Sequence, residues 1–461
     1  MEVQLSAPTP AVAQDSLRSI IRQKLVDSIA RPMPVLTPRD VWLPTVSNQA
    51  IAVIGMRRAG KTSLLWQIMA QQLAQGVPRE ALVYFSFEDE RLAGMRALDL
   101  QLVVDEYFKL YPARRDREKT VFLLDEIQLV PGWETFVRRI LDTETIALYL
   151  SGSSAKLLSR EIATSMRGRA MEAVVTPFSF REVLRHHGAL PAKPSPYWTK
   201  AQRSQLHHWL VQYLAYGGFP EVQSLLEPQH ARQRLELLKT YVDVVLLRDV
   251  IERHNVTQPQ VLRWLVQQLL GNAAGAFSVN KFFNDLKSRG VAVGKERLHE
   301  YLAHLEDTFL VTSINVASAS ERRRQVNPRK SYPADTGLSA LFDPVGKPNT
   351  GHALETVVLH ECLRRGAQVA YVRTASGFEV DFLATRFDGQ QTLIQVCADM
   401  NDPQTLERET RALQAAQFEH PAAQCLLITM EQPTRETVVP GMSVVLAPDW
   451  LLDTPGEGKM A

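Results

Sequence analysis

Apolar residues in the first part of the chain gather in short continuous runs, separated by longer segments in which apolar residues recur at helical spacing. A strand that is apolar on both faces is typical of a parallel sheet covered by helices on either side. The runs that predict strands lie at residues 51–54, 81–85, 121–124, 146–150 and 172–175. Because helical segments lie between them, the pattern predicts an α/β core built on a parallel sheet.

The pattern changes on both sides of this core. Residues 1–14 show no pattern and are expected to be unstructured, whereas residues 15–30 have apolar residues at helical spacing and predict a short helix. Beyond the core the chain is mostly helical, and strands return towards the C-terminus. The predicted segments are an N-terminal arm and helix at 1–47, the α/β core at 48–180, a helical segment at 181–255, a small helical module at 256–345 and a C-terminal α/β region at 346–461.

The composition is that of a globular protein. A chain of 461 residues is too long for one ordinary core, and about three domains are expected. The net charge of +2 is nearly zero, so any surface that attracts nucleic acid must be local.

Cys362, Cys397 and Cys425 form no Cys-x-x-Cys pair, which argues against a zinc site or a disulfide framework. No signal sequence or membrane-length apolar run is present, so we expect a cytoplasmic protein that does not bind membranes.

A phosphate-binding motif, Gly55-Met-Arg-Arg-Ala-Gly-Lys-Thr62, follows the first predicted strand and opens a helix. Glycines allow a tight turn in which backbone N–H groups point inward, and the helix N-terminus favours a bound anion. Lys61 is expected to reach the β- and γ-phosphates, and the hydroxyl of Thr62 to hold Mg²⁺. The residues expected to contact the nucleotide are Gly55, Arg57, Arg58, Ala59, Gly60, Lys61, Thr62 and Ser63.

Two acids, Asp125 and Glu126, follow the third apolar run. The carboxyl ends of parallel strands meet at the edge where open α/β sheets bind ligands. We expect Asp125 to bind Mg²⁺, partly through water, and Glu126 to orient and polarise the attacking water. Alone, such a pair is also found at solvated strand ends, but the upstream phosphate-binding motif favours the catalytic interpretation.

Two later stretches offer further catalytic residues. Small hydroxyl residues at 151–154 end the fourth apolar run and could hydrogen-bond the γ-phosphate or the attacking water, although a simple turn is the alternative. An arginine in Arg167-Gly-Arg169 could stabilise transition-state charge at a neighbouring subunit, or could be an ordinary surface residue. ATP is favoured over GTP because Asn280-Lys281 is followed by two phenylalanines, which is not a guanine-binding motif.

In the C-terminal region, residues 378–384 and 392–397 predict two strands around a turn at Asp388-Gly389. Folding about that turn brings Asp381 close to Gln395. A preceding helix carries Glu355 among apolar residues. Two carboxylates and an amide oxygen could hold Mg²⁺.

The order of these motifs resembles a family of bacterial and archaeal AAA+ ATPases with a C-terminal domain of unknown function. The resemblance covers nearly the whole chain. It implies a P-loop NTPase core, a helical lid, a winged helix and a restriction-endonuclease-like α/β domain, with Ser153 as a sensor and Arg169 as a trans-acting finger in a homo-oligomer. The motifs that carry it are Gly55-Met-Arg-Arg-Ala-Gly-Lys-Thr62, Leu124-Asp-Glu-Ile-Gln-Leu-Val-Pro-Gly-Trp133, Ser151-Gly-Ser-Ser154, Arg167-Gly-Arg169, Pro177-Phe-Ser-Phe-Arg-Glu182, Tyr216-Gly-Gly-Phe-Pro220, Arg248-Asp249, Asp335-Thr-Gly-Leu338 and Gly377-Phe-Glu-Val-Asp-Phe382.

The C-terminal region resembles the restriction-endonuclease pattern Glu…Asp…[Glu/Gln]-x-Lys at Glu355, Asp381 and Gln395, but Cys397 stands where the lysine is expected. A thiol cannot supply a positive charge beside a phosphate, so weak or absent nuclease activity is predicted.

The winged helix would place Lys295, Arg297 and His299 on its recognition helix, and a wing carrying Arg322-Arg-Arg324 and Arg329-Lys330 could contact DNA phosphates. Contact with a protein is the alternative. The sequence therefore predicts a Mg²⁺-dependent ATPase that couples hydrolysis to the handling of nucleic acid or a partner. An ATP-gated nuclease and a nucleotide-switched protein scaffold are the alternatives.

Overall fold

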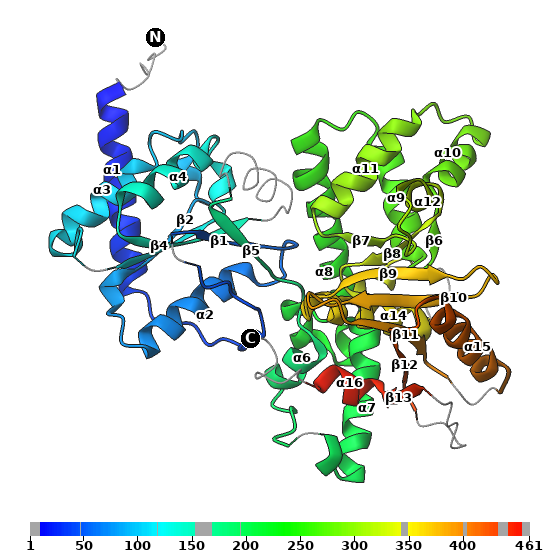
Figure 1. Ribbon diagram of the computed structural model, residues 1–461. Coiled ribbons are helices and arrows are strands. Elements are labelled where there is room, and N and C mark those ends of the chain that lie inside the picture. Colours follow the sequence, from blue (N-terminus) through cyan, green and yellow to red (C-terminus); the bar gives the residue numbers. More distant parts are fainter. Residues whose placement is uncertain are drawn as a thin grey trace. The chain divides into compact units, whose positions relative to one another are not determined.

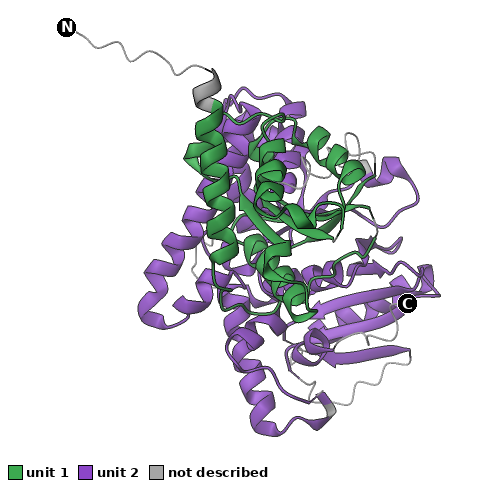
Figure 2. Ribbon diagram, turned by 90° about the vertical axis from the view of Figure 1, so that its left-hand side faces the viewer, with its two compact units in different colours: residues 1–176 green, residues 177–461 purple. Residues whose placement is uncertain are grey.

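The computed structural model describes residues 10–46, 48–117, 119–152, 168–193, 195–342, 349–399, 403–431 and 441–453. The chain divides into two compact units, Met1–Thr176 and Pro177–Ala461 (Figure 2). Both predicted α/β regions are present, one in each unit.

The first unit is built on a parallel sheet of five strands in the order β2-β3-β4-β1-β5. Every residue of β3, which lies between β2 and β4, is buried, which is why this strand reads as a continuous apolar run. The sheet confirms the predicted parallel α/β core. Its strands are β1 Ala50–Ile54, β2 Leu82–Ser86, β3 Thr120–Asp125, β4 Ile146–Gly152 and β5 Ala170–Val174.

Helices flank this sheet, with α2 below it and α4 above it in the view of Figure 1. Helix α4 buries Trp133, Phe136, Val137, Ile140 and Leu141, a spacing that places them on one face. The helices of the first unit are α1 Pro10–Ala30, α2 Lys61–Ala74, α3 Gln101–Leu110 and α4 Trp133–Thr143, with short 3-10 helices at η1 Arg79–Ala81, η2 Glu90–Leu92, η3 Pro112–Arg114 and η4 Ile127–Leu129.

Helix α1 begins at Pro10, so the prediction that residues 1–14 are all unstructured was wrong for its last part. Ion pairs hold this helix to α3. Arg18 and Arg22 contact the fully buried Glu106 at 3.0 Å and 2.6 Å, and Lys109 contacts it at 2.7 Å. Burial would raise the pKa of Glu106, but hydrogen bonds from these three cations outweigh it and lower the pKa to about 2.

The second unit begins with a helical segment. Capping boxes at Ser179–Glu182 and Thr199–Gln202 start two of its helices. The elements are α6 Phe180–His186, η5 Ser195–Tyr197, α7 Lys200–Tyr216, η6 Pro220–Leu225, η7 Pro228–His230, α8 Ala231–Val244 and the π-helix η8 Val245–Glu252.

The turn at Gly217-Gly218 connects this helical segment to a later motif. The N–H of Gly218 donates to the buried carboxylate of Asp335 at 2.6 Å. A Cβ on Gly217 would lie 1.6 Å from the same carboxylate, so the turn requires glycine there. The Gly217-Gly218 turn and Asp335, which are far apart in the sequence, therefore pack against each other.

A small module follows, in which helices accompany an antiparallel sheet in the order β6-β8-β7. Its elements are α9 Pro259–Gly271, β6 Ala276–Phe277, α10 Val279–Ser288, α11 Lys295–Asp307, β7 Val311–Ile314, α12 Glu321–Val326, β8 Arg329–Pro333 and the short α13 Thr336–Ser339.

The C-terminal sheet has the order β13-β12-β11-β10-β9, antiparallel around β10 and parallel beyond β11. Successive β11 residues face opposite ways: Ile394 packs in one apolar cluster with Val358 of α14, and Leu393 in another with Leu413 of α15. Two helices therefore cover the two faces. The elements are α14 Thr350–Arg364, β9 Gln368–Arg373, β10 Glu379–Thr385, β11 Gln391–Cys397, α15 Pro403–Glu419, β12 Gln424–Thr429, β13 Met442–Leu446 and α16 Ala447–Leu452; β9 and α16 were not predicted.

Candidate functional site

The phosphate-binding motif forms a tight loop between β1 and α2. Gly55 starts the loop with φ 151, and a Cβ there would lie 2.0 Å from the carbonyl oxygen of Val175, so only glycine fits. Gly60 ends it with φ 101 as the N-cap of α2. The buried Lys61 ammonium donates to the carbonyl oxygens of Gly55 (3.1 Å) and Met56 (3.2 Å). A positive charge is thus fixed at the loop that would receive phosphates.

The other loop residues differ in exposure. Arg57 is half-buried, Ala59 is buried, and Arg58 and Ser63 are exposed. Arg58 has φ 65, a left-handed conformation that side chains rarely adopt. The loop is therefore held in a shape that its own sequence does not favour at that position.

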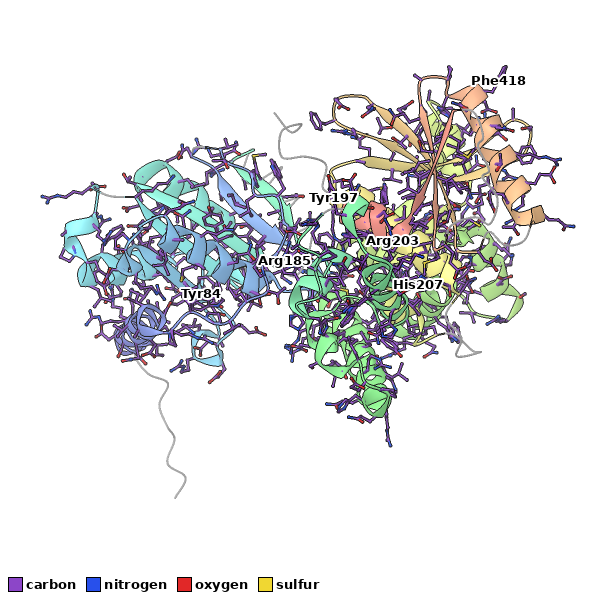
Figure 3. The ribbon with its side chains drawn as sticks, turned by 90° about the horizontal axis from the view of Figure 1, so that it is seen from below. Tyr84, Arg185, Tyr197, Arg203, His207 and Phe418 are labelled. Atoms are coloured by element: carbon purple, nitrogen blue, oxygen red, sulfur yellow. The ribbon has the colours of Figure 1, made fainter. Side chains whose placement is uncertain are left out.

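Asp125, at the end of β3, lies beside the start of α2. Its Oδ2 accepts hydrogen bonds from the hydroxyl of Thr62 at 2.9 Å and from the phenol of Tyr84 at 2.7 Å. Its Oδ1 accepts one from the hydroxyl of Ser151. Burial, with the charge of Asp125, raises the pKa of Tyr84, so the phenol remains a donor. Tyr84 comes from β2, the strand next to β3 (Figure 3).

Glu126 follows in a left-handed conformation, φ 56, and its N–H donates to Ser151 Oγ at 3.0 Å. The amide of Gln128 donates to Glu126 Oε2. Burial raises the pKa of Glu126; the charge of Lys61 opposes that rise and the charge of Asp125 adds to it. A carboxylate with a raised pKa is suited to accept a proton from water near neutral pH.

Ser153 and Arg169 were the other residues predicted for this site. Ser153 lies outside the described residues, as do Ser154 and Arg167. Arg169 directly precedes β5, and its guanidinium pairs with Asp142 of the same chain. Within this unit the structure thus brings together Lys61, Thr62, Asp125 and Glu126 with Ser151.

A second ionic centre lies in the second unit. Glu355, Asp381 and Gln395 meet there: Gln395 Nε2 donates to Asp381 Oδ2 at 2.9 Å. The buried ammonium of Lys330, on β8, lies 3.0 Å from carboxylate oxygens of Glu355, Asp381 and Glu379 alike. Burial alone would lower the pKa of Lys330, but the charges of the three carboxylates outweigh it and raise the pKa.

Glu355 accepts a further hydrogen bond from the phenol of Tyr332 at 2.7 Å. Burial raises the pKa of Glu355 to about 7, with the charge of Asp381 adding to the rise and Lys330 opposing it.

These contacts correct one expectation. Lys330 was expected to contact DNA phosphates from a wing, but only 5% of it is exposed and its ammonium has three carboxylate partners. The thiol of Cys397 contacts the carbonyl of Asp399 at 3.1 Å, and burial raises the pKa of this thiol to about 11. In the described parts of the chain, no group of three or more His, Cys, Asp or Glu side chains is arranged to hold a metal ion.

Sequence reasoning assigned no role to Tyr84 or Gln128, and it placed Lys330 in a wing instead of beside the acids. Tyr84 lies inside an apolar strand 41 residues from its partner Asp125, and Lys330 lies 51 residues from Asp381. No local pattern connects such positions.

The first site suits a magnesium–nucleotide complex. A hydroxyl and a carboxylate, Thr62 and Asp125, lie within 2.9 Å of each other, and such hard oxygen donors are those that Mg²⁺ prefers. The Lys61 ammonium at the glycine loop supplies charge for phosphates. A glycine loop joins strand β1 to helix α2, and the acid-ended strand β3 lies one strand away in the same parallel sheet, separated from β1 by β4. This arrangement defines a P-loop NTPase core.

Comparison with known proteins agrees with this class. Residues 47–184 match the model described as "AAA domain", and residues 207–348 match "Domain of unknown function (DUF8612)". The chain is 32% identical over 392 residues to "Uncharacterized protein MJ1544" of Methanocaldococcus jannaschii, covering 84% of this chain and 83% of that protein. It belongs to the same family of AAA-domain proteins.

Two other similarities were found. An "Uncharacterized protein" of Haemophilus influenzae is 28% identical over 403 residues, which are 87% of this chain and 93% of that protein. A solved structure titled "The walker-type atpase paby2304 of pyrococcus abyssi" has a TM-score of 0.42 and 13% identity, covering 70% of this chain and 95% of that one. A TM-score this low supports no inference about function.

Among the described helices, none has the length and apolar character needed to cross a lipid bilayer.

Proposed function

We propose that the protein binds ATP with Mg²⁺ and hydrolyses it at the site of Lys61, Thr62, Asp125 and Glu126. The observation that carries this proposal is the contact of Thr62 with Asp125 at 2.9 Å beside the buried Lys61 ammonium. This arrangement offers a hard-cation site next to a charged phosphate-binding loop.

In this proposal each group has one role. The loop N–H groups and Lys61 hold the phosphates, and Thr62 and Asp125 hold Mg²⁺, which would neutralise charge on the phosphate oxygens. Glu126 accepts a proton from the attacking water through the carboxylate that Gln128 orients. Ser151 fixes both acids, because its hydroxyl donates to Asp125 and accepts from the N–H of Glu126.

Glu126→Gln tests the assigned base. This variant should bind ATP with unchanged affinity but hydrolyse it roughly 10²- to 10⁴-fold more slowly, because the amide cannot accept the proton. Calorimetric binding and phosphate release under single-turnover conditions measure the two effects. Normal turnover by this variant would refute the role of Glu126. Glu134→Gln, a half-buried acid in the first turn of α4, is the matched control.

The assembly state is also part of the proposal. Arg169 would act on the nucleotide of a neighbouring subunit after leaving its intrachain partner Asp142. If so, mixing Arg169→Ala with Glu126→Gln should restore part of the ATPase activity, since one mixed interface would keep both groups. An absence of recovery would favour a site completed within one chain.

Hydrolysis would act on the second unit, and the element order from α9 to β8 supports a winged helix there. Helix α11 would then be the recognition helix, with Lys295, Arg297 and His299 available for DNA or a protein partner. ATPase rates measured with single-stranded DNA, duplex DNA and RNA test this coupling. A rate that no nucleic acid changes would favour a protein partner.

A second candidate function is that of an ATP-gated nuclease. The observation in its favour is Lys330, whose ammonium lies 3.0 Å from Asp381 and supplies the positive charge that Cys397 does not. Plasmid nicking with Mg²⁺ or Mn²⁺ should then be lost in Asp381→Ala and in Lys330→Met but kept in Cys397→Ala. Nicking that survives Asp381→Ala would come from a contaminant. The absence of a three-ligand metal group among the described residues makes this the weaker candidate.

A further inference from the structure

The segment between α1 and β1 contains a buried arginine, Arg39, which lies outside the core that the sequence predicted. Its Nη1 donates to the carbonyl oxygen of Ala59 at 2.9 Å, and its Nη2 donates to the carbonyl oxygen of Thr176 at 2.6 Å. Ala59 belongs to the phosphate-binding loop, and Thr176 follows β5. One guanidinium therefore joins the loop to the end of the sheet.

The backbone of Arg39 is fixed as well. Its N–H donates to the side-chain oxygen of Gln67 at 2.7 Å, and the amide of Gln67 donates to the carbonyl of Arg39 at 3.1 Å. Gln67 lies on α2, the helix that the loop opens. The arginine is thus held from both sides, and its planar head spans two carbonyl groups in a geometry that a lysine ammonium does not match.

The loop needs such support. Arg58, the residue before Ala59, is held at φ 65, a conformation that persists only where the surroundings enforce it. At the other end of the loop, Gly55 lies against Val175, the residue before Thr176. The segment Val175-Thr176 thus contacts one end of the loop directly and the other end through Arg39.

We propose that Arg39 is a positioning residue of the nucleotide site, which holds the phosphate-binding loop in its binding conformation from the segment that precedes the core. This inference rests on the proposed nucleotide binding. Without Arg39 the loop would adopt other conformations as well. Nucleotide would then bind only to the fraction of molecules whose loop is in the binding conformation. Contact between Arg39 and the nucleotide is not required.

The test is calorimetric titration of the full-length protein with ADP, with and without Mg²⁺. Arg39→Met should weaken ADP affinity about tenfold or more in both conditions, because the loop is needed with or without the metal. Arg39→Lys should fall between the wild type and Arg39→Met. Arg79→Met is the matched control, since Arg79 is also an arginine of the first unit that donates to two carbonyls, those of Leu82 and Ser28, away from the loop.

A merely structural role would make both arginine variants similar. We expect Arg79→Met to lower the melting temperature as Arg39→Met does, while its ADP affinity stays within about twofold of the wild type. Equal ADP affinity of Arg39→Met and the wild type would refute the inference alone. Absence of ADP binding by the wild type would refute the nucleotide site itself, and with it this role. If Arg39→Met does not fold, wild-type affinity in Arg39→Lys decides against the proposal.

Discussion

Lys61 in the first unit and Lys330 in the second are both buried, but they hold different partners. Lys61 donates to two backbone carbonyls, and the nearby Asp125 carboxylate has hydroxyl partners. Lys330 lies between three carboxylates and satisfies them directly. In the first site the ammonium contacts backbone carbonyls and the Asp125 carboxylate contacts hydroxyls, whereas in the second site the ammonium contacts the carboxylates themselves. The presence of a lysine near acidic residues therefore does not indicate its role until its hydrogen-bond and ion-pair partners are known.

The largest effect should come from breaking the second centre. Lys330→Met removes the ammonium that contacts all three carboxylates, so the second unit should lose about 3–5 kcal/mol of stability. Urea denaturation followed by far-UV circular dichroism measures it. The exposed Lys287→Met in the same unit is the control and should change stability by less than about 0.5 kcal/mol. Equal midpoints for the two variants would show that the buried centre adds no stability.

The pH dependence of the second unit sharpens the comparison. The pKa of Glu355 is raised from 4.5 to about 7, so the folded state holds a proton that the unfolded state releases. The resulting stability is present below about pH 4.5 and is lost as pH rises towards about 7. Glu355→Gln cannot titrate, so the difference in urea midpoint between it and the wild type should vary over this window. A constant difference would contradict the raised pKa.

The complementary change in the first unit is Lys61→Met. It should weaken ATP affinity roughly 10- to 100-fold, because charge-assisted hydrogen bonds to the phosphates are lost. Lys330→Met, if it folds, should leave ATP affinity nearly unchanged. Fluorescent-nucleotide titration of both variants measures this contrast, and similar losses in both would mean that the two centres are not independent.

The smallest expected effect concerns Tyr84. Tyr84→Phe removes the phenol that donates to Asp125 at 2.7 Å, so the carboxylate is less firmly held for Mg²⁺. We expect the Mg²⁺ concentration for half-maximal ATP affinity to rise roughly 3- to 10-fold, with little change in metal-free ADP binding. Tyr149→Phe, on β4 of the same sheet, is the control because burial alone raises the pKa of Tyr149. An unchanged Mg²⁺ requirement would remove Tyr84 from the site.

Much of the fold of the first unit could be predicted from local sequence patterns. Apolar runs marked the strands, and the glycine loop and the acids 125–126 marked the carboxyl edge of the sheet. In the second unit, the turn at Asp388-Gly389 correctly indicated that Asp381 and Gln395 would meet. These features depend on residues close in sequence or on one strand pairing, which periodicity and turn chemistry can specify.

The sequence by itself determined the parallel α/β core, the phosphate-binding loop and the acids beside it, because each is encoded within a few neighbouring residues. Only the tertiary structure decided that Arg39 supports the loop, that Tyr84 holds Asp125 and that Lys330 fills the carboxylate centre. Each of these side chains reaches a partner from a separate segment. Burial then stabilises the charge or the hydrogen bond of that side chain. The spacing of residues along the chain does not predict which distant group the side chain will contact.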